Sequence, residues 1–319
     1  MVHQSVRAGK CACLFSLLFA ATAVAGRRCL RFRTGAVQRQ SAKSGATHPN
    51  LEGQAAREGF SMIDFFGVGT QKGGTTALFN ALSKHPGLCL AERKELHLFD
   101  DERIDWRDPD LSGALDEFPP HSEEALLGDI TPIYAYWPNA LERIARYNPD
   151  ARLIFLLRHP AYRAYSHWKM ETKRGNEKLD FETAISQEGR QRVAASLGGV
   201  SRVYSYVERG FYPAQIRRML SLFPRHRVLI RTTDRLWTQP EQVLQEIQKF
   251  LGVEVRSLAS PSYVVPVDTS SAPPMPAHCR KALDALYADP ILESAKLSGL
   301  DLARWLDPDY EEPMLPEGS

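Results

Sequence analysis

The chain has 319 residues, of which 43% are apolar and 24% are charged, and its formal net charge is +2. Residues 1–51 hold eight of the 40 basic residues and no Asp or Glu, which leaves 32 basic against 38 acidic residues downstream, a net charge of −6. This acidic body excludes a protein that binds nucleic acid through overall positive charge, and its length suits one sizeable α/β domain.

The beginning of the chain has the layout of a targeting segment. Basic residues precede an apolar stretch, Cys11 to Ala25, that ends in small residues, and this predicts a signal peptide over about residues 1–25. The stretch is shorter than the roughly 17–25 residues that span a membrane, so a short membrane anchor is an alternative. An Arg-rich, acid-free segment follows, so a two-part plastid signal is another. We expect the secretory pathway, meaning the Golgi lumen or secretion.

Strands and helices alternate along residues 59–319, which we expect to fold as one domain after a targeting or disordered segment over residues 1–58. Apolar runs predict strands, and helical periodicity predicts helices. The expected strands are 62–68, 88–98, 126–129, 152–157 and 228–230. The expected helices are 75–84, 139–147, one that runs through 162–169 and ends at 174–176, 181–191, 204–223, 240–251, 277–287 and 291–305, with an irregular segment over 100–125. This pattern predicts an α/β fold of the P-loop-like type, with a central, mainly parallel sheet flanked by helices in three layers.

Metal-binding and disulfide patterns are missing from the sequence of this domain. Its two cysteines, Cys89 and Cys279, are far apart and form at most one bridge rather than a disulfide framework. The chain contains no HExxH motif and no paired CxxC motif. We therefore expect no metal site.

A glycine-rich loop lies between the first expected strand and the first expected helix. Such a loop presents backbone N–H groups and the positive end of a helix dipole, which together bind phosphate. In an ATP-binding loop, GxxxxGK[ST], the lysine follows the second glycine, whereas Lys72 precedes the pair Gly73-Gly74. The dinucleotide-binding pattern also fails, because Lys72 occupies its third glycine position. A plain strand-to-helix turn is the alternative.

The strand over residues 152–157 ends in a basic residue. A P-loop phosphotransferase usually places there an Asp that helps to hold magnesium, but this strand ends in Arg158, and Ser166 follows two helical turns later. An arginine and a serine so placed suit a second phosphate bound without metal. A surface ion pair is the alternative role for Arg158.

Together these stretches resemble the sulfotransferases, most closely the heparan-sulfate-type domains and their bacterial relatives. Residues 72–76 (KGGTT) resemble the 5′-phosphosulfate loop of that family, and residues 158–166 (RHPAYRAYS) resemble its 3′-phosphate motif. The resemblance covers about residues 62–306. Weaker matches are 95–99 (ELHLF), 128–134 (GDITPIY), 209–212 (RGFY) and 223–224 (FP).

The resemblance implies that the co-substrate is 3′-phosphoadenosine 5′-phosphosulfate (PAPS), bound without metal. Lys72 would stabilise the leaving phosphate as the S–O bond breaks. Arg158 and Ser166 would hold the 3′-phosphate. The 5′-phosphate would be held by Lys72, Gly73, Gly74, Thr75 and Thr76.

The resemblance also assigns the residue that takes the proton from the acceptor. Glu95 matches the general base of the family, and His97 matches a neighbouring histidine and is the second candidate base. On the expected strand, these two side chains would point the same way. The alternatives are a solvated surface charge for Glu95 and a packed histidine for His97.

The sequence departs from the heparan-type pattern on the acceptor side. Ile130 stands where those enzymes often have a lysine, and residues 257–276 lack their K-G-R element and cysteine pair. The expected acceptor is therefore a hydroxyl, or an amine, of a carbohydrate or a small molecule. Candidates for stacking on it are Trp106, Trp137 and Trp168, although ordinary packing suits Trp137 and Trp168 better.

Two other functions stay open, and the sequence sets no oligomeric state. A P-loop nucleotide kinase would need ATP and magnesium, and the place of Lys72 and Arg158 argues against it. A catalytically silent PAPS-fold protein that binds partners is the second, and the presence of Lys72 and Glu95 argues against it.

Overall fold

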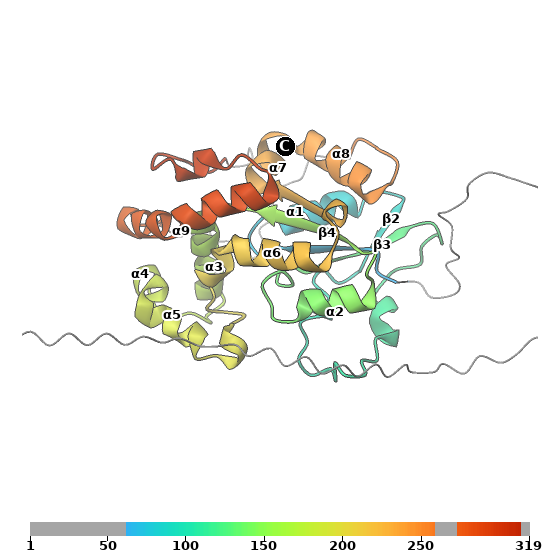
Figure 1. Ribbon diagram of the computed structural model, residues 1–319, viewed down its shortest axis with the longest axis horizontal. Helices are drawn as coiled ribbons and strands as arrows, with labels where there is room; N and C mark the ends of the chain where they lie inside the picture. Colours follow the sequence, from blue (N-terminus) through green and yellow to red (C-terminus); the bar gives the residue numbers. More distant parts are fainter. Residues whose placement is uncertain (1–61, 259–272, 314–319) are drawn as a thin grey trace, which may run out of the picture. The chain divides into compact units, whose positions relative to one another are not determined.

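One parallel sheet organises the part of the chain that the computed structural model describes, residues 62–258 and 273–313 (Figure 1). Its strand order is β2-β3-β1-β4-β5, and every neighbouring pair is parallel. The strands are β1 (Phe65–Gly69), β2 (Leu88–Leu90), β3 (Leu126–Ile130), β4 (Arg152–Leu157) and β5 (Val228–Thr232). The predicted α/β class with a mainly parallel sheet is confirmed.

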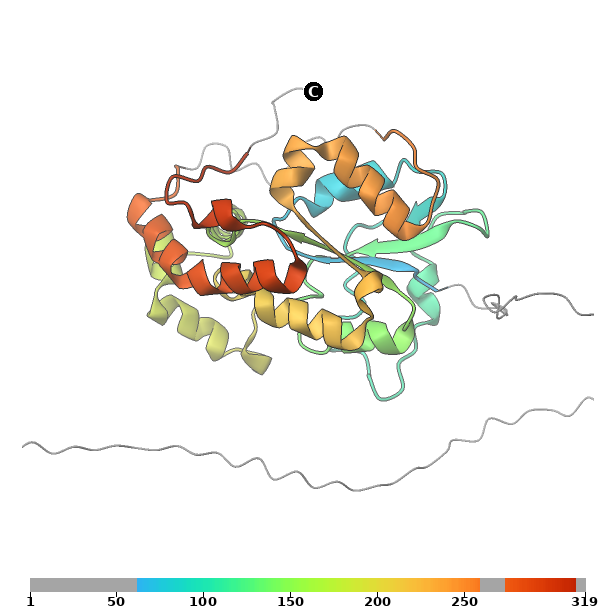
Figure 2. The same ribbon diagram turned by 45° about the horizontal axis from the view of Figure 1, so that its top comes forward.

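Helices cover both faces of this sheet (Figures 1 and 2). One face carries α1 (Thr75–Leu82), α7 (Thr233–Thr238) and α8 (Pro240–Leu251). The other carries α2 (Ala140–Tyr147), α3 (Pro160–Lys173), α6 (Tyr212–Leu222) and α9 (Ala277–Ser298), with the short α4 (Phe181–Ile185) and α5 (Gln187–Ala194) beyond α3. The described residues thus form the three expected layers.

The two faces of the sheet bury separate hydrophobic cores. Successive side chains of a strand point to opposite faces, so Phe65 packs in the core with α1, α7 and α8, whereas Phe66 packs in the core with the other helices. Ile154 and Phe155 of β4 divide in the same way. Burial on both sides explains why the central strands read as continuous apolar runs.

Several element boundaries differ from the prediction. The strand expected over 88–98 ends at Leu90, and α6 begins only at Tyr212. The helix expected over 181–191 breaks at Ser186, whose hydroxyl accepts the Gly189 N–H (3.2 Å) and so caps α5. The two helices expected over 277–305 are instead one helix, α9, which continues through Pro290 to Ser298.

Cys89 and Cys279 are both buried and unbridged. Over 62–258 and 273–313, no helix has the length and apolar character needed to cross a membrane. The expected targeting segment, with its possible cleavage or anchor, lies outside the described residues, as does most of the loop over 257–276.

The order of the strands indicates where a ligand can bind. From β1 the chain runs to β2 at one edge of the sheet, whereas from β4 it runs to β5 at the opposite edge, so the direction reverses between β1 and β4. In open parallel sheets, ligands bind beyond the carboxyl ends of the strands at such a reversal. The glycine loop follows β1 and Arg158 follows β4, so both lie at this point.

Candidate functional site

Hydrogen bonds hold the glycine loop, residues 70–74, in one shape. Lys72 and Gly74 have positive φ angles of 69° and 84°, and the Gly73 N–H donates to the Thr70 carbonyl (2.8 Å). The buried Thr233 hydroxyl, at the start of α7, lies 2.9 Å from the Gly73 carbonyl and 3.1 Å from that of Leu157. The loop is thus fastened to the ends of β4 and β5.

The helix that follows the loop offers its N-terminus to the same region. Thr75 and Thr76 form the first turn of α1, where backbone N–H groups have no partner within the helix. The N-cap residue, Gly74, makes no side-chain capping bond. The Gly73 N–H is used inside the loop, so the N–H groups of this first turn are the ones suited to an anion.

Lys72 lies in a cationic, half-buried environment. Its Nζ lies 3.8 Å from the Met170 sulfur on α3. Burial, and then the charges of Arg158, Arg174 and Lys169, lower its pKa to about 8, with partial opposition from Glu95. A bound anion would replace lost solvation and raise this pKa again.

Arg158 joins the loop to the end of β4. Its Nη1 donates to the Lys72 carbonyl (2.7 Å), and its Nε and Nη2 donate to the two carboxylate oxygens of Glu312 (2.7 and 2.5 Å). The Tyr212 hydroxyl donates to the Arg158 carbonyl (2.6 Å). Ser166 lies half-buried on α3. The structure thus brings together the two stretches that the sequence analysis singled out.

Glu95 and His97 lie in a loop rather than on the expected strand. Both have positive φ angles, 65° and 56°, which a strand does not allow, and β2 has ended at Leu90. Glu95 nevertheless accepts a hydrogen bond from Lys94, and its other oxygen lies 3.6 Å from His97 Nε2. The two side chains meet, but for a different reason than the alternation of a strand.

The buried carboxylate of Asp129 holds the loop that contains Glu95 and His97. Asp129, on β3, accepts hydrogen bonds from the hydroxyls of Thr131 and Tyr134 (both 2.7 Å) and from the Leu96 N–H (3.5 Å). The Tyr134 hydroxyl accepts the Leu98 N–H (3.0 Å). Burial raises the pKa of Asp129 to about 6, against the effect of these hydrogen bonds. The loop is therefore held by hydrogen bonds to the side chains of Asp129 on β3 and of Tyr134 just after it.

Opposite charges set the protonation of Glu95 and His97. Burial alone would favour neutral Glu95, but the neighbouring His97 and the charge of Lys94 lower its pKa to about 2. The hydrogen bond to Asp100 (2.9 Å), and then the neighbouring Glu95, raise the pKa of His97 to about 9. Arg202 also pairs with Asp100. At neutral pH, Glu95 is therefore ionised and His97 is protonated.

Some residues of this site carried no clear signal in the sequence. Thr233 lies in α7, a helix that the periodicity did not predict, and Glu312 is 154 residues away from Arg158. Arg209, which donates to Gln71 of the glycine loop, belongs to the RGFY stretch and was flagged without a role. Asp100 follows the ELHLF stretch directly and would have been found by extending it.

The tryptophans considered for stacking make contacts within the protein. Trp106 donates to the Asp101 carbonyl (2.8 Å), Trp137 to Glu102 (2.8 Å) and Trp168 to the Leu179 carbonyl (3.0 Å). Guanidinium groups also lie over the rings of Trp106 and Trp137. Each of the three indole N–H groups therefore has a partner within the protein.

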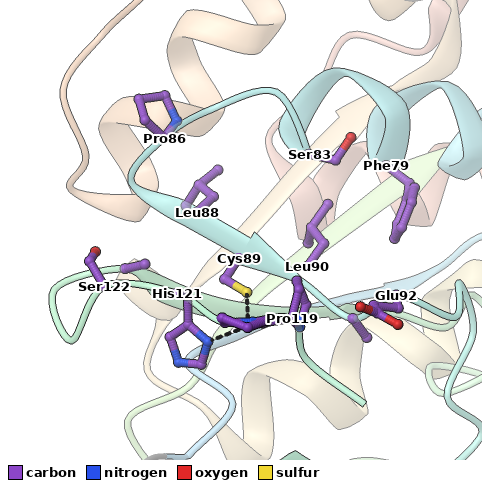
Figure 3. Close-up of a pocket in the computed structure, with 13 residues that line it drawn as sticks. Phe79, Ser83, Pro86, Leu88, Cys89, Leu90, Glu92, Pro119, His121 and Ser122 are labelled. Atoms are coloured by element: carbon purple, nitrogen blue, oxygen red, sulfur yellow. Dashed lines mark hydrogen bonds between the residues drawn. The ribbon is translucent and has the colours of Figure 1, made fainter. Parts of the chain in front are cut away.

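A separate pocket of about 410 Å³ lies along the edge strand β2 (Figure 3). Cys89 and His121 there both contact the Pro119 carbonyl (3.8 and 2.8 Å). None of the residues predicted from sequence as site residues lines it. Within the described ranges, no group of three or more His, Cys, Asp or Glu side chains is arranged to hold a metal.

Comparisons with known proteins agree with this architecture. A family model described as "Sulfotransferase domain" matches residues 63–265. Heparan sulfate glucosamine 3-O-sulfotransferase 5 of Homo sapiens is 26% identical over 226 residues, which are 67% of this chain and 62% of that protein. Heparan sulfate glucosamine 3-O-sulfotransferase 3B1 of Homo sapiens is 29% identical over 187 residues, or 59% of this chain and 45% of that protein.

The chain thus spans less than two thirds of the length of these curated relatives. One solved structure matches a larger share of this chain and almost the whole of its own length. The crystal structure of a sulfotransferase from Alicyclobacillus acidocaldarius has a TM-score of 0.66 and 26% identity, and the match covers 77% of this chain and 99% of that one.

Proposed function

Because the chain belongs to the sulfotransferase domain family, we propose that it moves a sulfonate group from PAPS to a hydroxyl of a carbohydrate. One contact carries this proposal: Arg158 donates to the Lys72 carbonyl (2.7 Å). It unites the glycine loop and the arginine at the end of β4 in one site. PAPS carries two separate anionic groups, and a two-part cationic site suits it better than it suits the single polyphosphate chain of ATP.

The donor would lie across this junction. The 5′-phosphate would take the N-terminal N–H groups and threonine hydroxyls at Thr75 and Thr76, with Gly73 and Gly74 giving the backbone close access. The 3′-phosphate would take Arg158, which can bind two oxygens at once, and the Ser166 hydroxyl. These assignments follow the family resemblance, and the position and donor chemistry of the residues agree with them.

Lys72 would act on the leaving group. As the acceptor oxygen attacks sulfur in line, the bond from sulfur to the bridging oxygen breaks, and negative charge collects on the departing 5′-phosphate. A lysine ammonium beside that oxygen stabilises the charge as it develops. The pKa of about 8 in the free protein would rise beside the anionic donor, so the ammonium form would persist during transfer.

Glu95, rather than His97, would take the proton of the acceptor. A general base must be unprotonated, and the pKa values of about 2 for Glu95 and about 9 for His97 satisfy this only for Glu95 at neutral pH. The pairing with Lys94 also weakens Glu95 as a base. An acceptor hydroxyl that displaces Lys94 would remove this effect and raise the basicity of the carboxylate.

The carbohydrate acceptor is inferred from the relatives, whose names specify heparan sulfate. Ile130, where heparan-type enzymes often have a lysine, is buried in the hydrophobic core with α1. We therefore leave the sugar open, and we retain the secretory pathway as the proposed location.

The test is a donor and acceptor panel with the full-length protein. Labelled PAPS is incubated with glycans, small alcohols and amines, with ATP and magnesium in parallel, and binding of adenosine 3′,5′-bisphosphate is measured by calorimetry. We expect transfer from PAPS to a glycan, and a loss of bisphosphate affinity of roughly 10–100-fold in Arg158→Ala. The exposed Arg304→Ala is the matched control.

Each of the other outcomes points to a different function for this protein. Failure to bind both PAPS and the bisphosphate contradicts the proposal. Phosphate transfer from ATP identifies a kinase, and tight PAPS binding without transfer to any member of the panel favours the silent binding protein.

A further inference from the structure

The arginine proposed to bind the 3′-phosphate already holds a carboxylate from the C-terminal part of the chain. Glu312 receives two hydrogen bonds from Arg158, at 2.7 and 2.5 Å. Both side chains are largely shielded, with 16% of Arg158 and 10% of Glu312 exposed. This paired geometry is the one by which a guanidinium also binds two oxygens of a phosphate.

The chain just before Glu312 is anchored independently of this ion pair. The Tyr310 hydroxyl donates to Asp234 (2.8 Å), and the Tyr310 carbonyl accepts from Tyr162 and Arg280 (both 3.1 Å). Its buried ring stacks on His159, with centroids 5.1 Å apart. Glu312 can therefore leave Arg158 by a movement of the two residues beyond Tyr310, while the anchor stays in place.

A second cation shares the surroundings of this carboxylate. The pKa of Lys169, on α3, is lowered by burial and then by Arg158, with Glu312 acting in the opposite direction. Two cations at one position favour an anion with higher charge than a carboxylate. A phosphate dianion offers more charge and one more oxygen, so it can displace Glu312.

We propose that Glu312 is a built-in competitor for the 3′-phosphate of the donor, an autoinhibitory contact that the donor must displace. This proposal rests on the proposed function, since it assigns the 3′-phosphate to Arg158. The site would bind only when Glu312 is released, so the apparent Kd equals the intrinsic Kd divided by the fraction of released molecules. Ligands without a 3′-phosphate would leave the ion pair intact and would not compete with it.

The experiment compares Glu312→Gln with the wild type in the full-length chain. Calorimetry measures the Kd of adenosine 3′,5′-bisphosphate and of adenosine 5′-monophosphate. We expect the variant to bind the bisphosphate about five- to tenfold more tightly, and the monophosphate with unchanged affinity. The control is Glu311→Gln, which removes an exposed carboxylate next to it and should change neither value.

A purely structural ion pair gives the opposite pattern. If Glu312→Gln binds the bisphosphate equally or more weakly than the wild type does, the competitor proposal is wrong while the PAPS assignment stands. If neither protein binds the bisphosphate, the proposed function fails, and this inference fails with it. Glu312→Ala repeats the comparison, and thermal unfolding of each variant verifies that it is folded.

Discussion

The candidate site has two parts: the proposed donor side makes its contacts mainly through backbone groups, and the proposed acceptor side through charged side chains. On the proposed donor side, residues 70–74 and Arg158, the hydrogen bonds involve backbone groups: the Gly73 N–H, the Gly73 carbonyl and the Lys72 carbonyl are all engaged. On the proposed acceptor side, residues 94–100, charged side chains contact one another in a loop supported by Asp129.

This difference decides what each side can tolerate and what it can select. A backbone cradle recognises features that every donor molecule shares, and it depends on glycine at a few positions. A network of side chains can change with single substitutions, so it suits the side that would select the acceptor. The predictions below test this division, beginning with the largest effect.

Glu95→Gln should lower kcat by about 10³-fold, within the 10²–10⁴-fold range for loss of a general base. Donor affinity should change little, because Glu95 lies on the acceptor side. The measurement is steady-state sulfation together with bisphosphate binding. Glu92→Gln, an exposed glutamate in the same segment, is the control. Near-normal turnover of Glu95→Gln would show that the base lies elsewhere.

Lys72→Ala should lower kcat by about 10²–10³-fold through loss of charge stabilisation. In the wild type, kcat/KM for PAPS should also fall as pH rises through about 8, because Lys72 of the free protein then loses its proton. The variant should lack that fall, and the exposed Lys84→Ala should keep it. A pH profile shared by both variants contradicts the assignment to Lys72.

Thr233→Val should weaken donor binding by about tenfold and lower the free energy of unfolding by about 1–3 kcal/mol. The substitution removes the donor that serves both the Gly73 and Leu157 carbonyls. Calorimetry and denaturant unfolding measure the two effects. The control, Thr238→Val, at an exposed position of the same helix, should change neither donor binding nor stability. An unchanged Kd in Thr233→Val would mean that the glycine loop is held by other contacts.

His97→Gln should lower kcat by less than about tenfold, since a protonated histidine positions Glu95 and does not accept the proton. The raised pKa makes His97 stabilising below about 6.5, and this contribution is lost as pH rises through about 9. The stability difference between wild type and variant should therefore shrink over that interval, and it should be small because the side chain is partly exposed.

The exposed His121→Gln, outside this loop, should leave kcat unchanged and is the control. A loss of kcat in His97→Gln as large as that in Glu95→Gln would make His97 the base.

The fold was predictable where local pattern and burial agree. The run RLIFLL is buried on both faces in β4, and Pro240 and Gly252 bound α8 at its start and end as expected. The helix α7 was missed because its six residues are too few to show a period. Pro290 misled the prediction of α9, because tertiary packing of the helix on both sides of a proline outweighs the local preference to stop.

The sequence predicted that the glycine loop and Arg158 lie together, but it predicted the arrangement around Glu95 and His97 only in part. Lys72 and Arg158 were found from their spacing relative to glycines and to a strand end, which are local features. Glu95 and His97 have positive φ angles, and the residues that follow them, Leu96 and Leu98, donate their N–H groups to Asp129 and Tyr134. Such contacts link residues more than 30 positions apart, and a local pattern does not contain them.

The bonds that Thr233 and Arg158 make to the glycine loop have a thermodynamic consequence. They order the loop during folding, so its conformational entropy is already lost before any ligand arrives. Binding to such a preorganised loop costs little further ordering and leaves more of the interaction energy for affinity. We therefore expect the glycine loop to stay ordered through each turnover. Any movement that limits the rate of donor binding would then occur in other parts of the chain.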